Sequence, residues 1–311
     1  MNESVTTAIS IRVRLFAIQR ELAGTRELTL PLAAGATIED AWSALVARHP
    51  VLEPGRSSVR FARNGTYADA VDILDDGDEL AFIPPVSGGA DESGSGIAAG
   101  AAVGGARILE LREEPFPADL VDRLSARLAT PEDGAIVAFV GRTRITPGTP
   151  APGQEADAAL HAGRVVESLE YEAHETMAVD VLAQIADEIA ARFGVRRLAI
   201  VHRTGEVPLG DASILIVACA AHRGDAFRAA EYAIEETKAR APIWKAERFE
   251  DGHLWIGAPA RGSAGDQTPT ASTGEAPPAA SAGGDASHQP PADAGHERPA
   301  GAGHEPPAGA S

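Results

Sequence analysis

The chain of 311 residues is poor in cysteine, in positive charge and in long apolar runs. Cys219 is its only cysteine, so an internal disulfide and a CxxC metal or redox site are both excluded. This residue lies in the apolar run SILIVACAA, which favours a small buried hydrophobe over a nucleophile. Any sulfur chemistry of this chain must therefore use a group other than a cysteine thiol.

Positive charge is scarce, because 27 lysines and arginines stand against 45 acidic residues, for a net charge of -18. Such a balance disfavours non-specific binding to nucleic acid or to anionic membranes. It is compatible with a small anionic substrate, because a local pocket can be basic inside an acidic protein. We therefore expect no nucleic-acid partner and no membrane partner.

No stretch approaches the roughly 20 apolar residues that cross a bilayer. The N-terminus lacks the basic-then-apolar layout of a signal peptide. We therefore expect a soluble, cytoplasmic protein. Bulky apolar residues almost disappear after Ile256, so the core-forming part of the chain ends near that point.

The first 89 residues combine strand patterns with one helix pattern. Thr37 is a predicted N-cap for a helix over 38–49, which Pro50 ends. Strands are predicted at 9–17, 27–32, 59–65 and 79–86, with turn regions at 21–24 and 75–78. The order β-β-α-β-β predicts a β-grasp (ubiquitin-like) domain over 1–89.

Residues 107–257 carry a second set of patterns. Strands are predicted at 107–112, 134–141, 164–172, 197–203, 212–220 and 253–257, the second of them buried. Helices are predicted at 117–129, around 177–189 and at 224–241. Mixed strands and helices in this order predict an α+β sandwich domain over 107–257.

Three segments lack any such pattern. Residues 90–106 are almost all small, which predicts a flexible linker between the two domains rather than a nucleotide-binding glycine loop. The segment 146–163 is predicted to be a mobile loop. Residues 258–311 repeat Pro, Ala, Gly, Ser, Asp and His and cannot bury enough surface to fold, so they form a predicted disordered tail.

The first domain contains the pieces LFAIQRELAG and DDGDELAFIPPV and the closing SGG at 87–89. With these pieces it resembles the small, sulfur-carrier subunit of molybdopterin synthase. The resemblance implies that Gly88-Gly89 is the end of the carrier, where an ATP-dependent enzyme adenylates the terminal carboxylate and a thiocarboxylate is then formed. Two glycines make a tail thin enough to enter a partner's site, because no Cβ obstructs the approach.

The second domain contains five blocks, which are GAIVAFVGRTR, LEYEAHETMA, VHRTGEVPLGD, AHRGDAF and KARAPIWKAE. In their sequence and order these blocks resemble the large, catalytic subunit of the same enzyme. The resemblance implies a molybdopterin synthase, which converts cyclic pyranopterin monophosphate to molybdopterin with two sulfurs. The sulfur donor would be thiocarboxylated Gly89, with no other cofactor and no metal. The family also implies a homodimer through the catalytic domain, with basic residues crossing the interface.

Carried over residue by residue, the family's catalytic lysines fall on Lys238 and Lys245, beside Gly89 as the carrier end. The substrate-binding residues fall on Arg144, His222 and Arg223. A cluster of such groups suits an anionic substrate, and a partly desolvated lysine with a lowered pKa could serve as general acid or base. Each also has a simpler interpretation: Lys238 could complement a helix dipole, and Arg144 could pair with a carboxylate.

Other residues of these blocks stay open at this point. His222-Arg223, where a strand meets a helix N-terminus, suits an anion on geometry alone. The second basic match, His202-Arg203, closes a strand and is less clearly part of a pocket. Trp244 and Trp255 are predicted to be core residues rather than partners that stack on a pterin.

The sequence departs from the carrier pattern at its end, because Ala90 follows Gly89 and a peptide bond cannot be adenylated as a carboxylate. We therefore expect a protease to cut after Gly89. Two alternatives remain: a ubiquitin-like sulfur carrier whose second domain only binds, or a regulatory uncut fusion without turnover of its own. An adenylating and sulfurating enzyme is the expected partner of Gly88-Gly89.

Overall fold

A computed structural model describes residues 8–86, 105–148, 159 and 162–257, and these described residues belong to one compact unit. The predicted end Gly88-Gly89, most of the predicted linker 90–106, most of the loop 146–163 and the tail 258–311 lie outside the described residues. No helix in the described ranges is long and apolar enough to cross a membrane.

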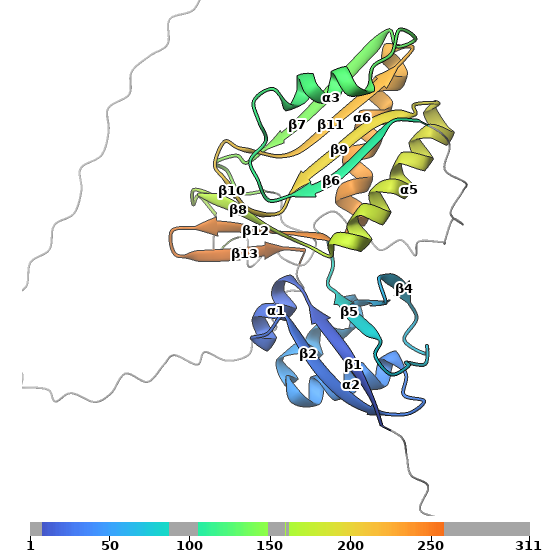
Figure 1. Cartoon of the computed structure of the whole chain (residues 1–311). Helices are drawn as coiled ribbons and strands as arrows, with labels where there is room; N and C mark the ends of the chain where they lie inside the picture. The colour runs from blue at the N-terminus through green and yellow to red at the C-terminus, as the bar shows by residue number, and fades with distance from the viewer. Residues whose placement is uncertain (1–7, 87–104, 149–158, 160–161, 258–311) are drawn as a thin grey trace, which may run out of the picture. The chain divides into compact units, whose positions relative to one another are not determined.

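The first region is a five-stranded sheet covered by helices (Figure 1). The strand order is β2-β1-β5-β3-β4, with β1 and β5 parallel and the other pairs antiparallel. In chain order its elements are β1 (Ala8–Leu15), α1 (Ala17–Ala23), β2 (Glu27–Ala33), α2 (Ile38–Arg48), the 3-10 helix η1 (Pro50–Ser58), β3 (Arg60–Arg63), β4 (Thr66–Ala68) and β5 (Glu79–Ile83). The predicted β-grasp fold is confirmed.

The helix α2 shows how local sequence forms this region. The Thr37 side chain accepts from the Asp40 backbone N–H while the Asp40 carboxylate accepts from the Thr37 N–H, so the first turn is capped in both directions. Ala41, Trp42 and Leu45 are then buried in the core of this region. The predicted helix and its N-cap are confirmed.

Helix α1 corrects one prediction. The sequence pattern predicted a strand over 9–17 and a turn at 21–24, but the strand ends at Leu15 and a helix fills Ala17–Ala23. Phe16, Ala17 and Ile18 are buried in a cluster that also contains Trp244 and Trp255. The segment Ala17–Ala23 (AIQRELA) consists mostly of good helix formers, and its start packs against residues more than 200 positions away in sequence.

The second region contains two four-stranded sheets, ordered β6-β9-β11-β7 and β10-β8-β12-β13. Only β6 and β9 pair in parallel among its described strands. Its elements are β6 (Arg107–Arg112), α3 (Leu120–Leu128), β7 (Ala135–Arg142), β8 (Ser168–Ala173), α5 (Glu175–Phe193), β9 (Arg197–Arg203), β10 (Gly205–Pro208), β11 (Ala212–Ala220), α6 (Arg223–Arg240), β12 (Ile243–Phe249) and β13 (Gly252–Ile256). The predicted α+β architecture is confirmed, and β10 and β12 are strands that the sequence patterns did not predict.

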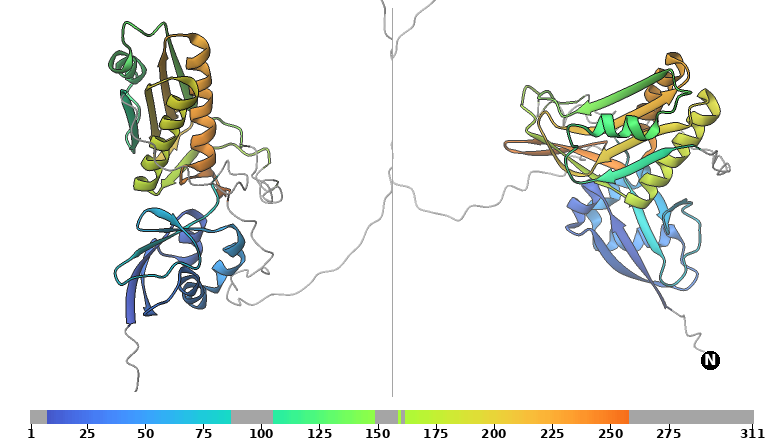
Figure 2. Two further views of the ribbon diagram at one scale, coloured as in Figure 1. Left: turned by 90° about the vertical axis from the view of Figure 1, so that its right-hand side faces the viewer. Right: turned by 45° about the horizontal axis from the view of Figure 1, so that its top comes forward.

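Helices cover both faces of the β6-β9-β11-β7 sheet. Helices α5 and α6 pack on one face and form the largest apolar cluster, while α3 packs on the other (Figure 2). Cys219 faces α3 and is buried, as predicted, and burial raises the pKa of its thiol. This cysteine therefore serves as a core residue.

Strand β7 is less buried than predicted. It is an edge strand that pairs with β11, and Ile136, Phe139 and Val140 are between about a third and a half exposed. Its apolar run was interpreted as a buried strand because a continuous run without alternation usually has cover on both faces. Helix α3 packs against β9 and β11 instead, which leaves this part of the sheet less covered.

Candidate functional site

Lys245 lies on β12 with a buried carboxylate as its neighbour. Its Nζ is 3.2 Å from Oε1 of Glu247, which is two residues further along the strand and therefore on the same face. The same oxygen accepts the backbone N–H of Gly148 at 3.0 Å. The Lys245 side chain is about one-fifth exposed and that of Glu247 almost fully buried. The lysine head group is thus held in one place, with the segment after Arg144 against it.

Lys238 and Arg144 lie at the same end of the second region. Lys238 is in the last turn of α6, which Pro242 separates from β12. Arg144 follows β7, where hydrogen bonds between Thr143, Gly210 and Asp211 tie the chain to the start of β11. Both side chains are exposed, and neither has an ion pair or side-chain hydrogen bond to any described residue. Both are therefore available to a ligand.

The second pair of predicted substrate-binding residues lies far from the lysines. His222 and Arg223 begin α6, whereas Lys238 is 15 residues beyond Arg223 on the same helix. At 1.5 Å per residue this separates the two groups by about 22 Å. Both side chains are exposed, with no side-chain partner among the described residues. One copy of the chain therefore brings Arg144, Lys238 and Lys245 to one end of the region and leaves His222-Arg223 at the other.

His202-Arg203, at the end of β9, is buried. His202 Nδ1–H donates to the Arg203 carbonyl oxygen at 2.7 Å, and burial lowers the pKa of His202 to about 4. The Arg203 guanidinium contacts Asp211 Oδ2 at 3.2 Å and donates to the Glu206 carbonyl oxygen at 3.0 Å. Because its imidazole is neutral and its guanidinium already has partners, this pair is part of the core rather than an anion receptor.

The first region, residues 8–86, contacts the sheet that holds Lys245. The indole N–H of Trp244, next to Lys245, donates to the Pro84 carbonyl oxygen at 3.0 Å, just after β5 ends. Phe16 stacks on the same indole with ring centroids 4.9 Å apart. The Trp255 indole donates to Glu21 at 2.7 Å. Trp244 and Trp255 are core residues, as predicted, and the core they join lies between the two regions.

A buried carboxylate anchors this interface. Glu172, on β8, accepts the backbone N–H of Ala17 at 2.9 Å and lies 3.4 Å from Arg20 and 3.3 Å from Arg26. Ala17 has a positive φ of 48°, a strained conformation for a residue with a side chain, and it begins α1 at this carboxylate. Glu172 therefore holds the first region by a backbone hydrogen bond and by ion pairs with two arginines.

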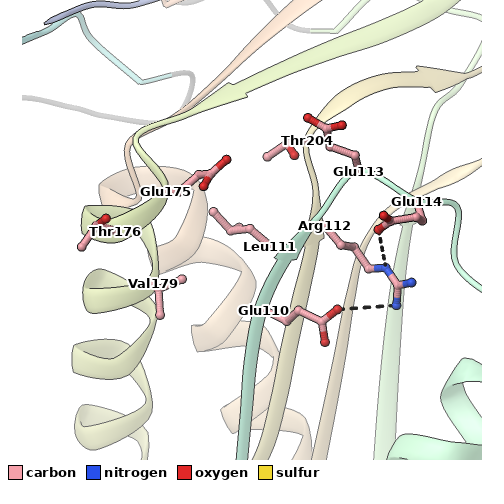
Figure 3. A pocket seen from close by; sticks show the side chains of 9 residues that line it. All are labelled: Glu110, Leu111, Arg112, Glu113, Glu114, Glu175, Thr176, Val179 and Thr204. Carbon is pink, nitrogen blue, oxygen red and sulfur yellow. Dashed lines mark ion pairs between the residues drawn. The ribbon is translucent and has the colours of Figure 1, made fainter.

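An open pocket of about 580 Å³ lies elsewhere, between β6 and the start of α5 (Figure 3). Arg112 is its one basic residue, and it already pairs with Glu110 and Glu114. It is lined by Glu110, Leu111, Arg112, Glu113, Glu114, Glu175, Thr176, Val179 and Thr204. Four carboxylates against one guanidinium repel a phosphate, so this pocket is not the site for an anionic substrate.

Glu247 and Glu172 were not predicted as site residues from the sequence. The signal for Glu247 was the spacing Lys-Ala-Glu, which places both charges on one face of a strand, but β12 itself was not predicted. Glu172 lies in an alternating run that was assigned to a strand, where a carboxylate normally faces water. This face of the strand is buried only because the first region packs against it.

Comparisons with known proteins match both regions. The MoaE protein family model matches residues 111–240, and the ThiS family model matches residues 13–89. A molybdopterin synthase catalytic subunit of Halalkalibacterium halodurans is 35% identical over 147 residues, which cover 47% of this chain and 83% of that protein.

Two further comparisons show how much of each protein is shared. A molybdopterin synthase catalytic subunit of Oryza sativa subsp. indica is 43% identical over 122 residues, 39% of this chain and 56% of that protein. The chain thus spans little more than half the length of this relative. The crystal structure of molybdopterin synthase from Staphylococcus aureus matches with 37% identity and a TM-score of 0.41, over 48% of this chain and 96% of that one.

Proposed function

The chain belongs to the family of molybdopterin synthase catalytic subunits, and from this premise we propose that it is a molybdopterin synthase that carries its own sulfur carrier. The reaction is the conversion of cyclic pyranopterin monophosphate to molybdopterin by two sulfur deliveries. In each delivery the thiocarboxylate sulfur of Gly89 attacks a substrate carbon, the bond from that carbon to its oxygen breaks, and the oxygen leaves as water or as an alkoxide that takes up a proton. Water then hydrolyses the acyl–sulfur bond, leaving the sulfur on the substrate and a carboxylate on Gly89.

The main support for this proposal is the position at which the chain leaves β5, the last strand of the carrier sheet. Its next residue, Pro84, is hydrogen-bonded to Trp244, which precedes Lys245 on β12. Gly89 is five residues beyond Pro84, a reach of at most about 18 Å. A carrier end docked this close to a largely buried lysine suits transfer of an acyl-bound sulfur within one polypeptide.

The proposed roles follow from the surroundings of each residue. Lys245, held by Glu247, would transfer protons and stabilise the oxyanion that forms when water attacks the Gly89 carbonyl. The exposed Lys238 and Arg144 at the same end would bind the anionic substrate and neutralise the displaced oxygen.

We assign His222 and Arg223 to the site of a second copy. Their separation of about 22 Å from Lys238 along α6 supports this assignment, since one phosphate cannot bridge it. The partly exposed apolar residues of the β7 edge, Ile136, Phe139 and Val140, offer a surface for that second copy. A homodimer with residues of both copies in each site would satisfy both observations.

The carrier end has to be processed before it can act. We propose cleavage after Gly89, then adenylation and sulfuration by an ATP-dependent partner enzyme, with the thiocarboxylate as the only sulfur source and no further cofactor. This chemistry is placed in the cytoplasm, where ATP is available for the activating step.

The test is sulfur transfer by protein purified from its native cell and supplied with the activating enzyme, ATP and substrate. Lys245→Ala should lower molybdopterin formation roughly 10²- to 10⁴-fold, as expected for loss of a general acid or base. Arg123→Ala, on the exposed face of α3, is the matched control and should leave the rate unchanged. Wild-type rates in Lys245→Ala would exclude the assigned role.

Intact-mass measurement of the same protein tests the processing step. An N-terminal fragment ending at Gly89, with one oxygen replaced by sulfur after loading, is the expected species. A single uncut chain that still forms molybdopterin would contradict cleavage after Gly89.

A further inference from the structure

The β10-β8-β12-β13 sheet has two faces that belong to different parts of the reaction. Trp244, Ala246 and Trp255 point to one face and pack against the first region, residues 8–86, which we call the carrier region. Lys245 alternates with Trp244 along β12, so it points to the opposite face with Glu247. A carrier end that docks on the first face must therefore cross the sheet to reach the lysine.

The end of β13 lies beside Lys245 in the sheet. This strand is the edge of its sheet, and its residue Ile256 pairs with Lys245. Neighbouring strands are about 4.8 Å apart, and the three residues that follow Val86, up to Gly89, can reach at most about 10 Å. A chain that passes around the end of β13 is therefore long enough to reach the strand that carries Lys245.

Gly257 follows β13 at this point, and the carrier backbone lies against it. A Cβ built on Gly257 would be 3.0 Å from the carbonyl oxygen of Pro85 and 3.0 Å from both the carbonyl carbon and the carbonyl oxygen of Val86. These are backbone atoms of the chain leaving β5, so they cannot swing aside as a flexible side chain could. Val86 is also packed against the Trp244 cluster, which limits its movement further.

We propose that Gly257 is a positioning residue for the carrier end. Its missing side chain opens the passage through which the backbone of Pro85–Val86 crosses the end of β13 toward Lys245. Gly257 takes no part in the chemistry, and it affects the reaction only by leaving room for the backbone of Pro85–Val86. This inference rests on the proposed function for its purpose, but the passage itself can be tested without turnover.

Besides the close approach of the carrier backbone, the conformation of its own backbone also favours glycine at position 257. Gly257 has a φ of 90°, where any side chain causes backbone strain whatever the space around it. Gly194, at the end of α5, has a φ of 70°, and a Cβ added there would have nothing within 4 Å. Gly194→Ala therefore also places a side chain at a positive φ in the second region without obstructing the tail, and is the control for Gly257→Ala.

The first test follows the Trp244 indole N–H by hydrogen exchange in the full-length chain, where its acceptor is the Pro84 carbonyl oxygen. Gly257→Ala and Gly257→Val should speed its exchange roughly tenfold or more, because the tail no longer seats. The indole of Trp42, buried in the carrier core, should exchange as in the wild type and shows that the fold persists. Unchanged Trp244 exchange in Gly257→Val, or equal acceleration in Gly194→Ala, would overturn the proposal.

The second test is a single turnover of processed and loaded protein. Gly257→Ala should load sulfur at Gly89 normally but transfer it at least about tenfold more slowly, whereas Gly194→Ala should transfer at the wild-type rate. Sulfur transfer at the wild-type rate in Gly257→Val would contradict the role proposed for Gly257. If the wild type itself forms no molybdopterin, the proposed function fails, while the indole measurement still decides the role of Gly257.

Discussion

The catalytic region contains two His-Arg pairs that look alike in sequence and differ in every physical respect. His202-Arg203 ends β9, is buried and has partners for both side chains. His222-Arg223 begins α6, is exposed and has no side-chain partner among the described residues. A basic pair thus becomes part of the core where a strand ends inside the protein, and a candidate receptor where a helix begins at the surface.

The largest difference should appear in stability. Arg203→Ala removes a buried side chain together with its bonds to Asp211 and Glu206, and should lower the free energy of unfolding by roughly 3 kcal/mol. Arg223→Ala should change it by less than about 0.5 kcal/mol, as for most surface positions. Denaturant unfolding of both variants measures this, and equal losses would mean that the two pairs are not distinct.

The pH dependence of stability should separate the two histidines. The pKa of His202 is about 4 when folded, against an ordinary value of 6.5, so the unfolded chain binds its proton more readily between these values. Stability should therefore fall by about 3 kcal/mol as the pH drops from 6.5 to 4, through this group alone.

The comparison that isolates this effect is His202→Gln against His222→Gln. The first variant should lose less stability than the wild type between about pH 7 and pH 4. His222→Gln makes the same substitution at an exposed position and is the matched control. Because the carboxylates are common to all three proteins, the difference between curves reports the histidine. A His202→Gln curve parallel to that of the wild type would contradict a buried neutral imidazole.

The exposed pair should matter for activity instead. Arg223→Ala removes the charge-assisted contact that we propose between this residue and the substrate phosphate, and should lower turnover roughly 10- to 100-fold at unchanged stability. Mixing it with Lys245→Ala tests the second copy. Half of randomly exchanged dimers would combine both variants and contain one intact site, which restores about a quarter of wild-type activity. No recovery after verified subunit exchange would place both residues in one copy's site.

The smallest expected effect is a difference in chemical reactivity between Lys238 and Lys245, which are the only lysines of the chain. Lys238 is exposed, whereas Lys245 is about four-fifths buried beside Glu247. A limiting amount of acetic anhydride should therefore modify Lys238 several-fold faster than Lys245, as peptide masses can show. Glu247→Gln should narrow that difference by releasing the Lys245 head group, and an unchanged ratio would indicate that the carboxylate does not hold it.

Local sequence was sufficient for much of the fold. The Thr37 capping box and the apolar spacing of α5 act within a few residues, so the helices they specify could be predicted without tertiary information. The ordered family blocks likewise identified Lys238 and Lys245 as candidates. What could not be predicted was which candidates lie together, because Lys238 and Arg223 are close in sequence yet separated by nearly the whole of α6.

The sequence by itself determined two folding regions, their order and the types of residue available for chemistry, since periodicity and capping are local properties. Only the tertiary structure decided that Phe16 and Ala17 are buried with Trp244 and Trp255, that β7 is partly exposed and that His202-Arg203 is core. It also decided that the chain leaving β5 passes Gly257, which lies more than 170 residues further along. The physical reason is that burial and steric fit depend on partners distant in sequence, and no local pattern records them.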